Sequence, residues 1–106
     1  MGAYEIAVFT RREALLDMNE AYYWHANEEL SWGKELLEEL QKAVLLTCTF
    51  PRAWPNKFRT YRELLLPRFP YILIYEHLEE KGVLVIYSLF PGRRDPAGKF
   101  RRWNSL

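Results

Sequence analysis

Apolar side chains recur at helical spacing near the start of the chain. Within residues 11–26 the repeat forms one apolar stripe flanked by two alanines: Leu15, Met18 and Tyr22, with Ala14 and Ala21. This period predicts an amphipathic helix. Thr10 is followed three residues later by Glu13, which matches a capping box and predicts that the helix begins just after Thr10.

A second helical repeat covers residues 28–47 and is more strongly amphipathic. Its predicted buried face holds small and apolar residues: Gly33, Leu36, Leu37, Leu40, Ala43 and Val44. Its predicted solvent face holds charged residues: Lys34, Glu35, Glu38, Glu39 and Lys42. Asn27 predicts a break between the two helices, and Pro51 stops the second one. So short a connection predicts an antiparallel helical hairpin.

Alternation of apolar and polar positions predicts four strands. The first covers residues 3–9, and the second covers residues 58–66, after a loop at 51–57 that contains two prolines. Residues 71–77 are rich in aromatic and β-branched side chains, and residues 83–90 follow after a polar turn. Short links join the last three strands, which predicts an antiparallel meander.

The predicted order of elements is β-α-α-β-β-β, which indicates a two-layer α+β fold. We expect the helical hairpin to pack on one face of a mainly antiparallel four-stranded sheet. The opposite face is expected to stay partly open. A length of 106 residues predicts a single domain over residues 1–106, with a basic C-terminal tail from about residue 97.

The net charge of +1 hides a separation of charge along the chain. Residues 11–46 contain four basic and eight acidic residues, a net charge of −4. Residues 51–70 contain five basic residues and one acidic residue, and residues 91–106 have the same balance, so each carries +4. If the two basic segments meet in space, they form a positive face suited to an anionic partner.

Composition narrows the chemistry that the chain can perform. Cys48 is the only cysteine, which excludes an internal disulfide and a cysteine zinc cluster and fits a cytosolic protein. No apolar run approaches the ~20 residues of a membrane span, and the N-terminus lacks the pattern of a secretory signal. His25 and His77 have no partners at metal-ligand spacing, and there is no glycine-rich phosphate loop. We therefore expect no metal, no cofactor and no membrane partner.

Arginines near the ends of the predicted strands are the best candidates for a functional site, because a guanidinium matches phosphate or carboxylate. Five arginines are predicted to contact a target: Arg59, Arg62, Arg68, Arg93 and Arg94. Arginines beside a tyrosine could cleave RNA without a metal. The candidates for that reaction are Arg62, Tyr87, Arg93 and Arg94, with Tyr61 as a second tyrosine. The same cluster could instead bind an acidic segment of a protein, and the residue types alone do not separate the two functions.

Several motifs occur in an order that matches a known family. Tyr22-Tyr23 lies in the first helix, Phe50-Pro51 follows the second, and residues 62–71 read RELLLPRFPY before Ile74-Tyr75. Residues 93–96 then read RRDP. With these motifs the chain resembles the RelE/ParE superfamily of toxins from type II toxin–antitoxin systems, in particular the branch called plasmid stabilisation proteins. The resemblance covers about residues 4–96 and implies the same β-α-α-β-β-β fold.

The resemblance implies a small cytoplasmic toxin that is held inactive by a cognate antitoxin, with which it could form a hetero-oligomer. It also implies one of two targets. RelE-like members are mRNA interferases that cut messenger RNA on the ribosome. ParE-like members inhibit DNA gyrase and are not known as nucleases.

Departures from the family pattern favour the ParE-like function. By register, the middle-strand arginine of RelE-like nucleases falls at Ile72 and their tail tyrosine falls near Phe100. Pro91 stands where the plasmid stabilisation branch commonly has a histidine. We therefore expect a gyrase inhibitor whose arginines act as contacts and not as a catalytic set. The alternatives are a RelE-like, metal-independent endoribonuclease and a degenerate member that binds its antitoxin without being toxic.

Overall fold

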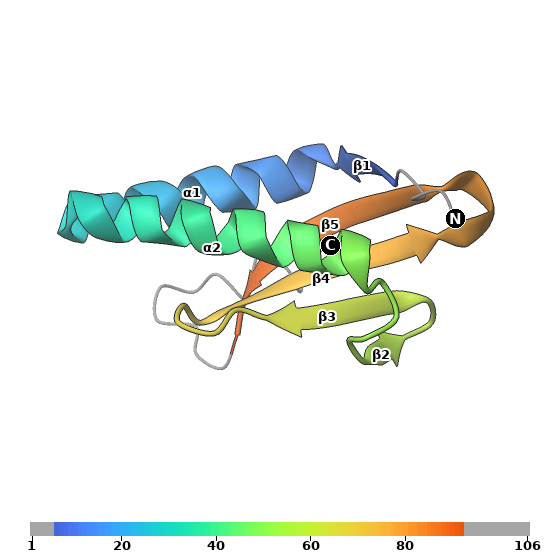
Figure 1. Cartoon of the computed structure of the whole chain (residues 1–106). Helices are drawn as coiled ribbons and strands as arrows, with labels where there is room; N and C mark the ends of the chain where they lie inside the picture. Colours follow the sequence, from blue (N-terminus) through green and yellow to red (C-terminus); the bar gives the residue numbers. More distant parts are fainter. Residues whose placement is uncertain (1–5, 93–106) are drawn as a thin grey trace.

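The computed structural model describes residues 6–92 of the chain. Its helices and strands are β1 (Ala7–Thr10), α1 (Arg12–Glu28), α2 (Leu30–Thr49), β2 (Asn56–Phe58), β3 (Tyr61–Leu65), β4 (Tyr71–Leu78) and β5 (Val83–Pro91). One turn of 3-10 helix, Glu79–Lys81, connects β4 to β5. The two helices lie side by side over one face of the sheet (Figure 1). The predicted two-layer α+β architecture is therefore confirmed in outline.

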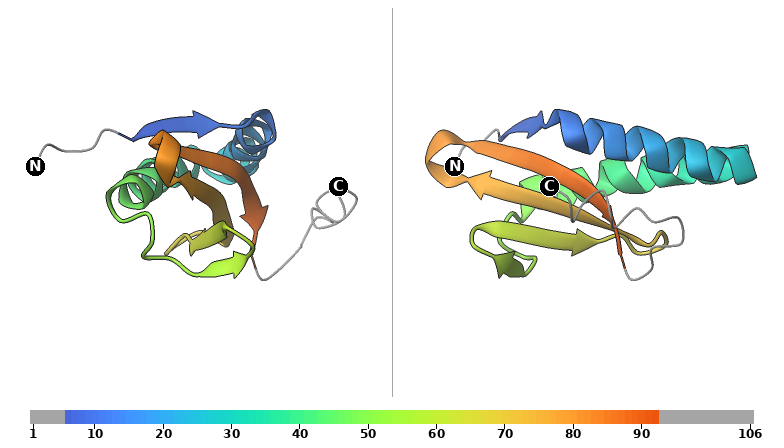
Figure 2. Two further views of the ribbon diagram at one scale, coloured as in Figure 1. Left: turned by 90° about the vertical axis from the view of Figure 1, so that its right-hand side faces the viewer. Right: turned by 180° about the vertical axis from the view of Figure 1, so that it is seen from behind.

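The sheet has five strands in the order β1-β5-β4-β3-β2. β1 pairs with β5 in parallel, and the other three pairs are antiparallel, so the sheet is mixed (Figure 2). The prediction of four strands was wrong, because residues 56–58 form an additional strand where most of the segment was expected to be a loop. A two-residue turn, Arg59 and Thr60, folds this strand back onto β3, which begins at Tyr61 and not at residue 58.

Both helices begin and end one or two residues later than predicted. Thr10 does not cap α1: it is the last residue of β1, and the N-cap is Arg11, which makes no side-chain capping bond. The break between the helices falls at Glu29, whose backbone is extended, and not at Asn27. Gly33 allows the helices to approach closely, because a Cβ there would lie 2.8 Å from that of Ala26. Within residues 6–92, no helix is long and apolar enough to cross a membrane.

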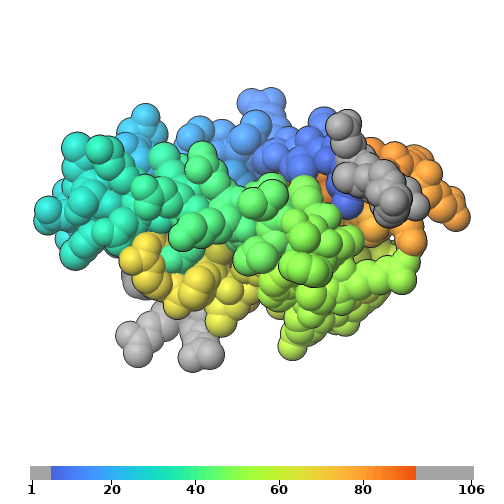
Figure 3. All heavy atoms as spheres, in the orientation of Figure 1, coloured from blue at the N-terminus to red at the C-terminus, as the bar shows by residue number. Residues whose placement is uncertain are grey.

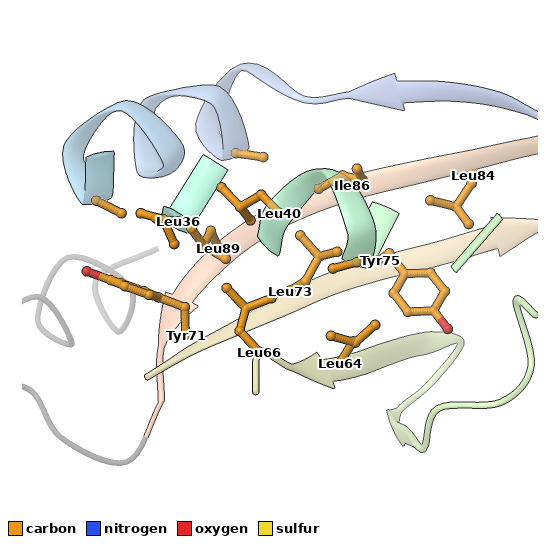
Figure 4. Packing of buried hydrophobic residues seen from close by; sticks show 13 residues of the cluster. Leu36, Leu40, Leu64, Leu66, Tyr71, Leu73, Tyr75, Leu84, Ile86 and Leu89 are labelled. Carbon is orange, nitrogen blue, oxygen red and sulfur yellow. The ribbon is translucent and has the colours of Figure 1, made fainter. Parts of the chain in front are cut away.

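The hydrophobic core lies between the helices and one face of the sheet (Figure 4). On β4, Tyr71, Leu73 and Tyr75 point into this core and are at most 6% exposed. The alternating residues of β4 point the other way and are half-buried: Ile72, Ile74 and Glu76. We call the side of the sheet that carries these three residues the open face, since both helices lie on the other side (Figure 2).

Two acidic side chains of the helices are buried, which the sequence pattern did not indicate. Asp17 in α1 is 4% exposed and accepts hydrogen bonds from Ser88 Oγ (2.9 Å) and the Leu89 backbone N–H (3.2 Å) of β5. Glu39 in α2 is 6% exposed, so its predicted place on the solvent face was wrong. Two predicted core leucines, Leu15 and Leu37, are correspondingly about half exposed. Each of these carboxylates is buried because another segment supplies its hydrogen-bond donors, β5 for Asp17 and Arg68 of the turn before β4 for Glu39.

Candidate functional site

Arg62 belongs to the core side of the sheet and stabilises the loop that follows α2. Its Nη1 donates to the Trp54 carbonyl oxygen at 2.7 Å and to the Arg52 carbonyl oxygen at 3.4 Å. Tyr75, the partner of Arg62 across the β3–β4 ladder, donates its hydroxyl to the Pro51 carbonyl oxygen at 2.8 Å. Two side chains of the sheet thus satisfy three carbonyls of one loop, which fixes the loop conformation.

Arg68 lies in the turn between β3 and β4 and pairs with α2. Its Nε donates to Glu39 Oε2 at 2.9 Å, and its backbone N–H donates to Glu39 Oε1 at the same distance. Glu35 lies 3.4 Å from its Nη1. Figure 3 shows this turn (yellow) packed below α2 (teal to green). Although Arg68 is itself exposed, its contacts tie the turn to a nearly buried carboxylate.

The open face carries a line of three aromatic rings, which we call the aromatic row: Phe58, Tyr61 and Tyr87. Phe58 and Tyr61 are stacked with centroids 6.3 Å apart, and Tyr61 meets the edge of Tyr87 at 5.0 Å. An arginine lies over each end of the row. Arg59 is 5.2 Å from the Phe58 ring centre, and Arg11 is 5.5 Å from that of Tyr87. The row therefore combines flat apolar surface with cations at cation–π distance.

Two backbone irregularities place side chains of the aromatic row. The register between β4 and β5 shifts between Ile74 and Tyr75, which leaves Tyr87 as the extra residue of a β-bulge. Bulges re-aim a side chain and are frequent beside functional sites. Arg59 has a φ of 54°, the one positive φ of a non-glycine residue within residues 6–92. A left-handed conformation is costly for such a residue and, at a surface turn, suggests a functional constraint.

Glu76 lies beside the aromatic row and accepts one hydrogen bond at each of its two carboxylate oxygens. Tyr87 donates its hydroxyl to Glu76 Oε1 at 2.8 Å, and Thr60 donates its hydroxyl to Glu76 Oε2. Burial of Tyr87, together with this bond to the carboxylate, raises the pKa of Tyr87 to about 12. The Tyr87 hydroxyl is protonated near neutral pH, and its proton is directed at Glu76.

Two of the residues predicted to be catalytic if the chain is a nuclease lie on opposite sides of the sheet. Arg62 faces the core side and the loop after α2, whereas Tyr87 lies on the open face with its hydroxyl bonded to Glu76. Arg93 and Arg94 lie outside the described residues, so the structure does not place them. Arg59 is the predicted contact that lies beside the aromatic row. In the part of the chain that is described, no three His, Cys, Asp or Glu residues gather closely enough to hold a metal ion.

Three residues of this site were missing from the sequence-based candidates: Arg11, Phe58 and Glu76. Arg11 reaches the row because β1 pairs with β5 in parallel, and its backbone N–H donates to the Ile86 carbonyl oxygen at 3.0 Å. Phe58 reaches it through the unpredicted β2 hairpin. The alternation of β4 could have placed Glu76 on the open face, but nothing in the sequence indicated its two donors.

One hollow on the described part of the molecule lies away from the aromatic row. It has a volume of about 720 Å³ and is lined by Ile6, Cys48, Thr49, Pro51, His77, Glu79 and Gly82. Partial burial raises the pKa of the Cys48 thiol, so the thiol is protonated and a weak nucleophile. Charge, aromatic rings and backbone irregularities coincide at the aromatic row, which is the candidate site.

A family model and several solved structures match the chain. Residues 8–96 match the family model described as ParE toxin of type II toxin-antitoxin system, parDE. The fold is similar to a structure from the chromosomal ParDE system of P. aeruginosa, with a TM-score of 0.61 and 15% identity over 86% of this chain and all of that one. No curated protein gives a significant sequence match.

Two structures of the E. coli RelE toxin match the fold of this chain about as well. The isolated RelE toxin has a TM-score of 0.63 at 19% identity and covers 98% of this chain and all of its own. A chain of the intact RelBE toxin-antitoxin complex has a TM-score of 0.63 at 23% identity, over 87% of this chain and all of its own. At these identities, the similarity shows a shared fold alone.

Proposed function

The chain belongs to the ParE toxin family of type II toxin–antitoxin systems, and from this premise we propose that it acts in the cytoplasm as an inhibitor of DNA gyrase. In this proposal a cognate antitoxin neutralises it. The aromatic row and its two arginines form the contact surface for the target. Arg93 and Arg94, which follow β5 in the sequence, are proposed as further contacts.

The observation that carries the proposal is the division of the candidate catalytic residues between two sides of the sheet. A metal-free nuclease needs its phosphate clamp and its proton donor around one phosphate. Arg62 is instead bonded to the Trp54 carbonyl, and Tyr87 lies on the other side with its proton on Glu76. A pKa of about 12 further makes Tyr87 a poor proton donor near neutral pH. This arrangement favours binding over RNA cleavage.

A protein as the target agrees with the chemistry of the aromatic row. Aromatic and arginine side chains are enriched where protein interfaces gain most of their energy. Phe58 is 62% exposed and has Arg59 above its ring, so a partner could bury both together. Lys57 and Arg59 add positive charge to this edge of the sheet, which suits a partner with acidic residues.

The outer surface of the helices supports a second protein partner, which we propose to be the antitoxin. Several leucines of α1 and α2 are between 42% and 66% exposed: Leu15, Leu16, Leu37, Leu45 and Leu46. So many exposed apolar side chains on one small domain are typical of an interaction surface. An antitoxin segment that folds on binding could cover them, giving a toxin–antitoxin hetero-oligomer.

The decisive experiment adds the purified protein to DNA gyrase and follows supercoiling of relaxed plasmid. We expect supercoiling to be blocked and to recover when the antitoxin, sought in the neighbouring reading frame, is added. Arg59→Ala should raise the inhibitory concentration by ~tenfold if this arginine is a central contact. Lys34→Ala, at an exposed position of α2, removes a charge on the other side of the sheet from the row and is the matched control.

Two other outcomes would select the alternatives. Intact supercoiling together with cleavage of ribosome-bound messenger RNA would show the RelE-like endoribonuclease. If neither activity is found and expression without antitoxin leaves growth unaffected, the chain is a degenerate member that only binds its antitoxin.

A further inference from the structure

Glu76 connects two strands and a turn on the open face. It lies on β4, and its two carboxylate oxygens have different donors. Tyr87 of β5 donates to Oε1 at 2.8 Å, and Thr60, in the turn between β2 and β3, donates to Oε2. A carboxylate with two hydroxyl donors restricts both side chains, because each bond to a charged acceptor is stronger than one to a neutral acceptor.

Tyr87 is itself one end of the aromatic row, and Thr60 is next in sequence to the arginine that lies over the other end. Tyr87 is the bulged residue of β5 and has Arg11 over its ring. Thr60 follows Arg59, whose backbone has a φ of 54° and whose guanidinium lies over Phe58. The hydroxyl bond of Thr60 therefore holds the turn in which the left-handed Arg59 occurs.

We infer that Glu76 is a positioning residue that sets both ends of the target-contact surface, Tyr87 directly and Arg59 through Thr60. The inference rests on the proposed function in that it takes the aromatic row as the surface that meets the target. Glu76 has no contact with a target in this proposal. It acts by fixing the ring of Tyr87 against Tyr61 and by keeping the Arg59 turn in its left-handed conformation.

The charge of Glu76 is compatible with a positive contact surface because both of its carboxylate oxygens already accept hydrogen bonds from hydroxyls of the chain. Arg11 and Arg59 lie at the two ends of the row, and Glu76 is bonded to hydroxyls between them. Removing the carboxylate would add to the net positive charge. A simple electrostatic view therefore predicts tighter binding of an acidic partner by Glu76→Ala, whereas the positioning role predicts weaker binding.

The test compares Glu76→Ala and Glu76→Gln with the control Glu63→Ala in the gyrase assay. Glu63 is a half-buried glutamate on the same open face, in β3, where it pairs with Ile74. We expect Glu76→Ala to raise the half-inhibitory concentration ~tenfold. Glu76→Gln should raise it less, because the amide oxygen still accepts a bond from Tyr87. Glu63→Ala should stay within about twofold of wild type.

A second measurement does not depend on any target. Ultraviolet absorbance follows tyrosine ionisation, and the difference between wild type and Glu76→Ala isolates the tyrosine that changes. The pKa of Tyr87 is about 12 in the intact site, and without the carboxylate it should fall toward its ordinary value of 10. Tyr61 and Arg11 also face the Tyr87 ring, and both are retained in Glu76→Ala and Glu76→Gln. Trypsin cleavage after Arg59 should become faster in Glu76→Ala as the turn loosens.

The two measurements separate the inference from the proposed function. If wild type does not inhibit gyrase, the gyrase proposal is overturned, while the Tyr87 titration and the cleavage after Arg59 still decide the role of Glu76. Unchanged tyrosine titration and unchanged cleavage in Glu76→Ala would overturn the positioning role whatever the target is. Tighter inhibition by Glu76→Ala would also overturn it. Circular dichroism checks that each variant is folded, and Glu76→Gln provides the test if Glu76→Ala is not.

Discussion

The two faces of the sheet use similar side chains for different purposes. Tyr75 on the core side is fully buried and donates its hydroxyl to the main-chain oxygen of Pro51. Tyr87 on the open face is half-buried and donates its hydroxyl to the carboxylate of Glu76. Burial raises the pKa of both hydroxyls. One tyrosine therefore fixes a loop of the scaffold, and the other fixes part of the proposed contact surface.

The arginines show the same contrast. Arg62 on the core side donates through Nη1 to two loop carbonyls, so it helps to hold the scaffold together. Arg59, three positions earlier, lies over an exposed ring at the edge of the open face. A guanidinium already bonded to the main chain is less available to a partner than one that lies over an aromatic ring. Substitutions should therefore lower stability on one side and function on the other.

The largest effect on stability is expected from the core side, with Leu73→Ala. Leu73 is completely buried under the helices, and removing its side chain should lower the free energy of unfolding by about 3 kcal/mol. The same change at Leu65, which is half exposed on the neighbouring strand, should cost less than about 1 kcal/mol. Urea unfolding followed by circular dichroism measures both. Equal losses at the two positions would contradict the division between the faces.

An intermediate effect is expected from removing one hydroxyl on each face. Tyr75→Phe leaves the half-buried Pro51 carbonyl without this donor and should lower the free energy of unfolding by about 1 kcal/mol. Tyr87→Phe should cost less at neutral pH, because water can solvate the half-exposed Glu76 carboxylate in place of the hydroxyl. Gyrase inhibition should weaken with Tyr87→Phe only. Loss of inhibition with Tyr75→Phe at full stability would place the loop after α2 in the contact surface.

The fold could be predicted from the sequence where packing produces a regular period. The two helices and the strands at 71–77 and 83–90 were predicted because apolar side chains repeat at helical or strand spacing. The ends of the helices were missed by one or two residues, since local geometry sets them: Thr10 pairs with Ile86 in the sheet and cannot cap α1. The strand at 56–58 was missed because it is short and follows two prolines.

The candidate site was less predictable because contacts between distant segments create it. Arg59 was predicted as a contact, and Tyr61 and Tyr87 as candidate tyrosines, but their geometry depends on a two-residue turn and a bulge without a sequence signature. Glu39 was assigned to solvent by its helical position, yet Arg68, from the turn after β3, supplies its donors. Periodicity reports which side of an element is apolar, and it carries no information on which polar groups meet across elements.

The smallest expected effect is a pH dependence of stability that arises from the raised pKa of Tyr87. The pKa of Tyr87 is near 10 in the unfolded chain and about 12 in the folded one. Below pH 10 the hydroxyl is protonated in both states, so the stabilisation linked to the raised pKa is fully present. Between pH 10 and 12 the unfolded chain loses this proton first, and the folded state loses stability as the pH rises.

Tyr87→Phe removes this ionisation and should flatten that part of the stability curve. We expect the urea midpoint of wild type to fall more steeply than that of Tyr87→Phe as the pH rises from 10 to 12. Lysines and the other tyrosines also titrate there, and they contribute equally to both proteins, so the difference between the two curves isolates Tyr87. Glu76→Gln should give an intermediate slope, because loss of the negative charge removes part of the cause of the raised pKa. Parallel curves for wild type and Tyr87→Phe would contradict the bond between Tyr87 and Glu76, and with it the view that the open face is held in one arrangement before a target binds.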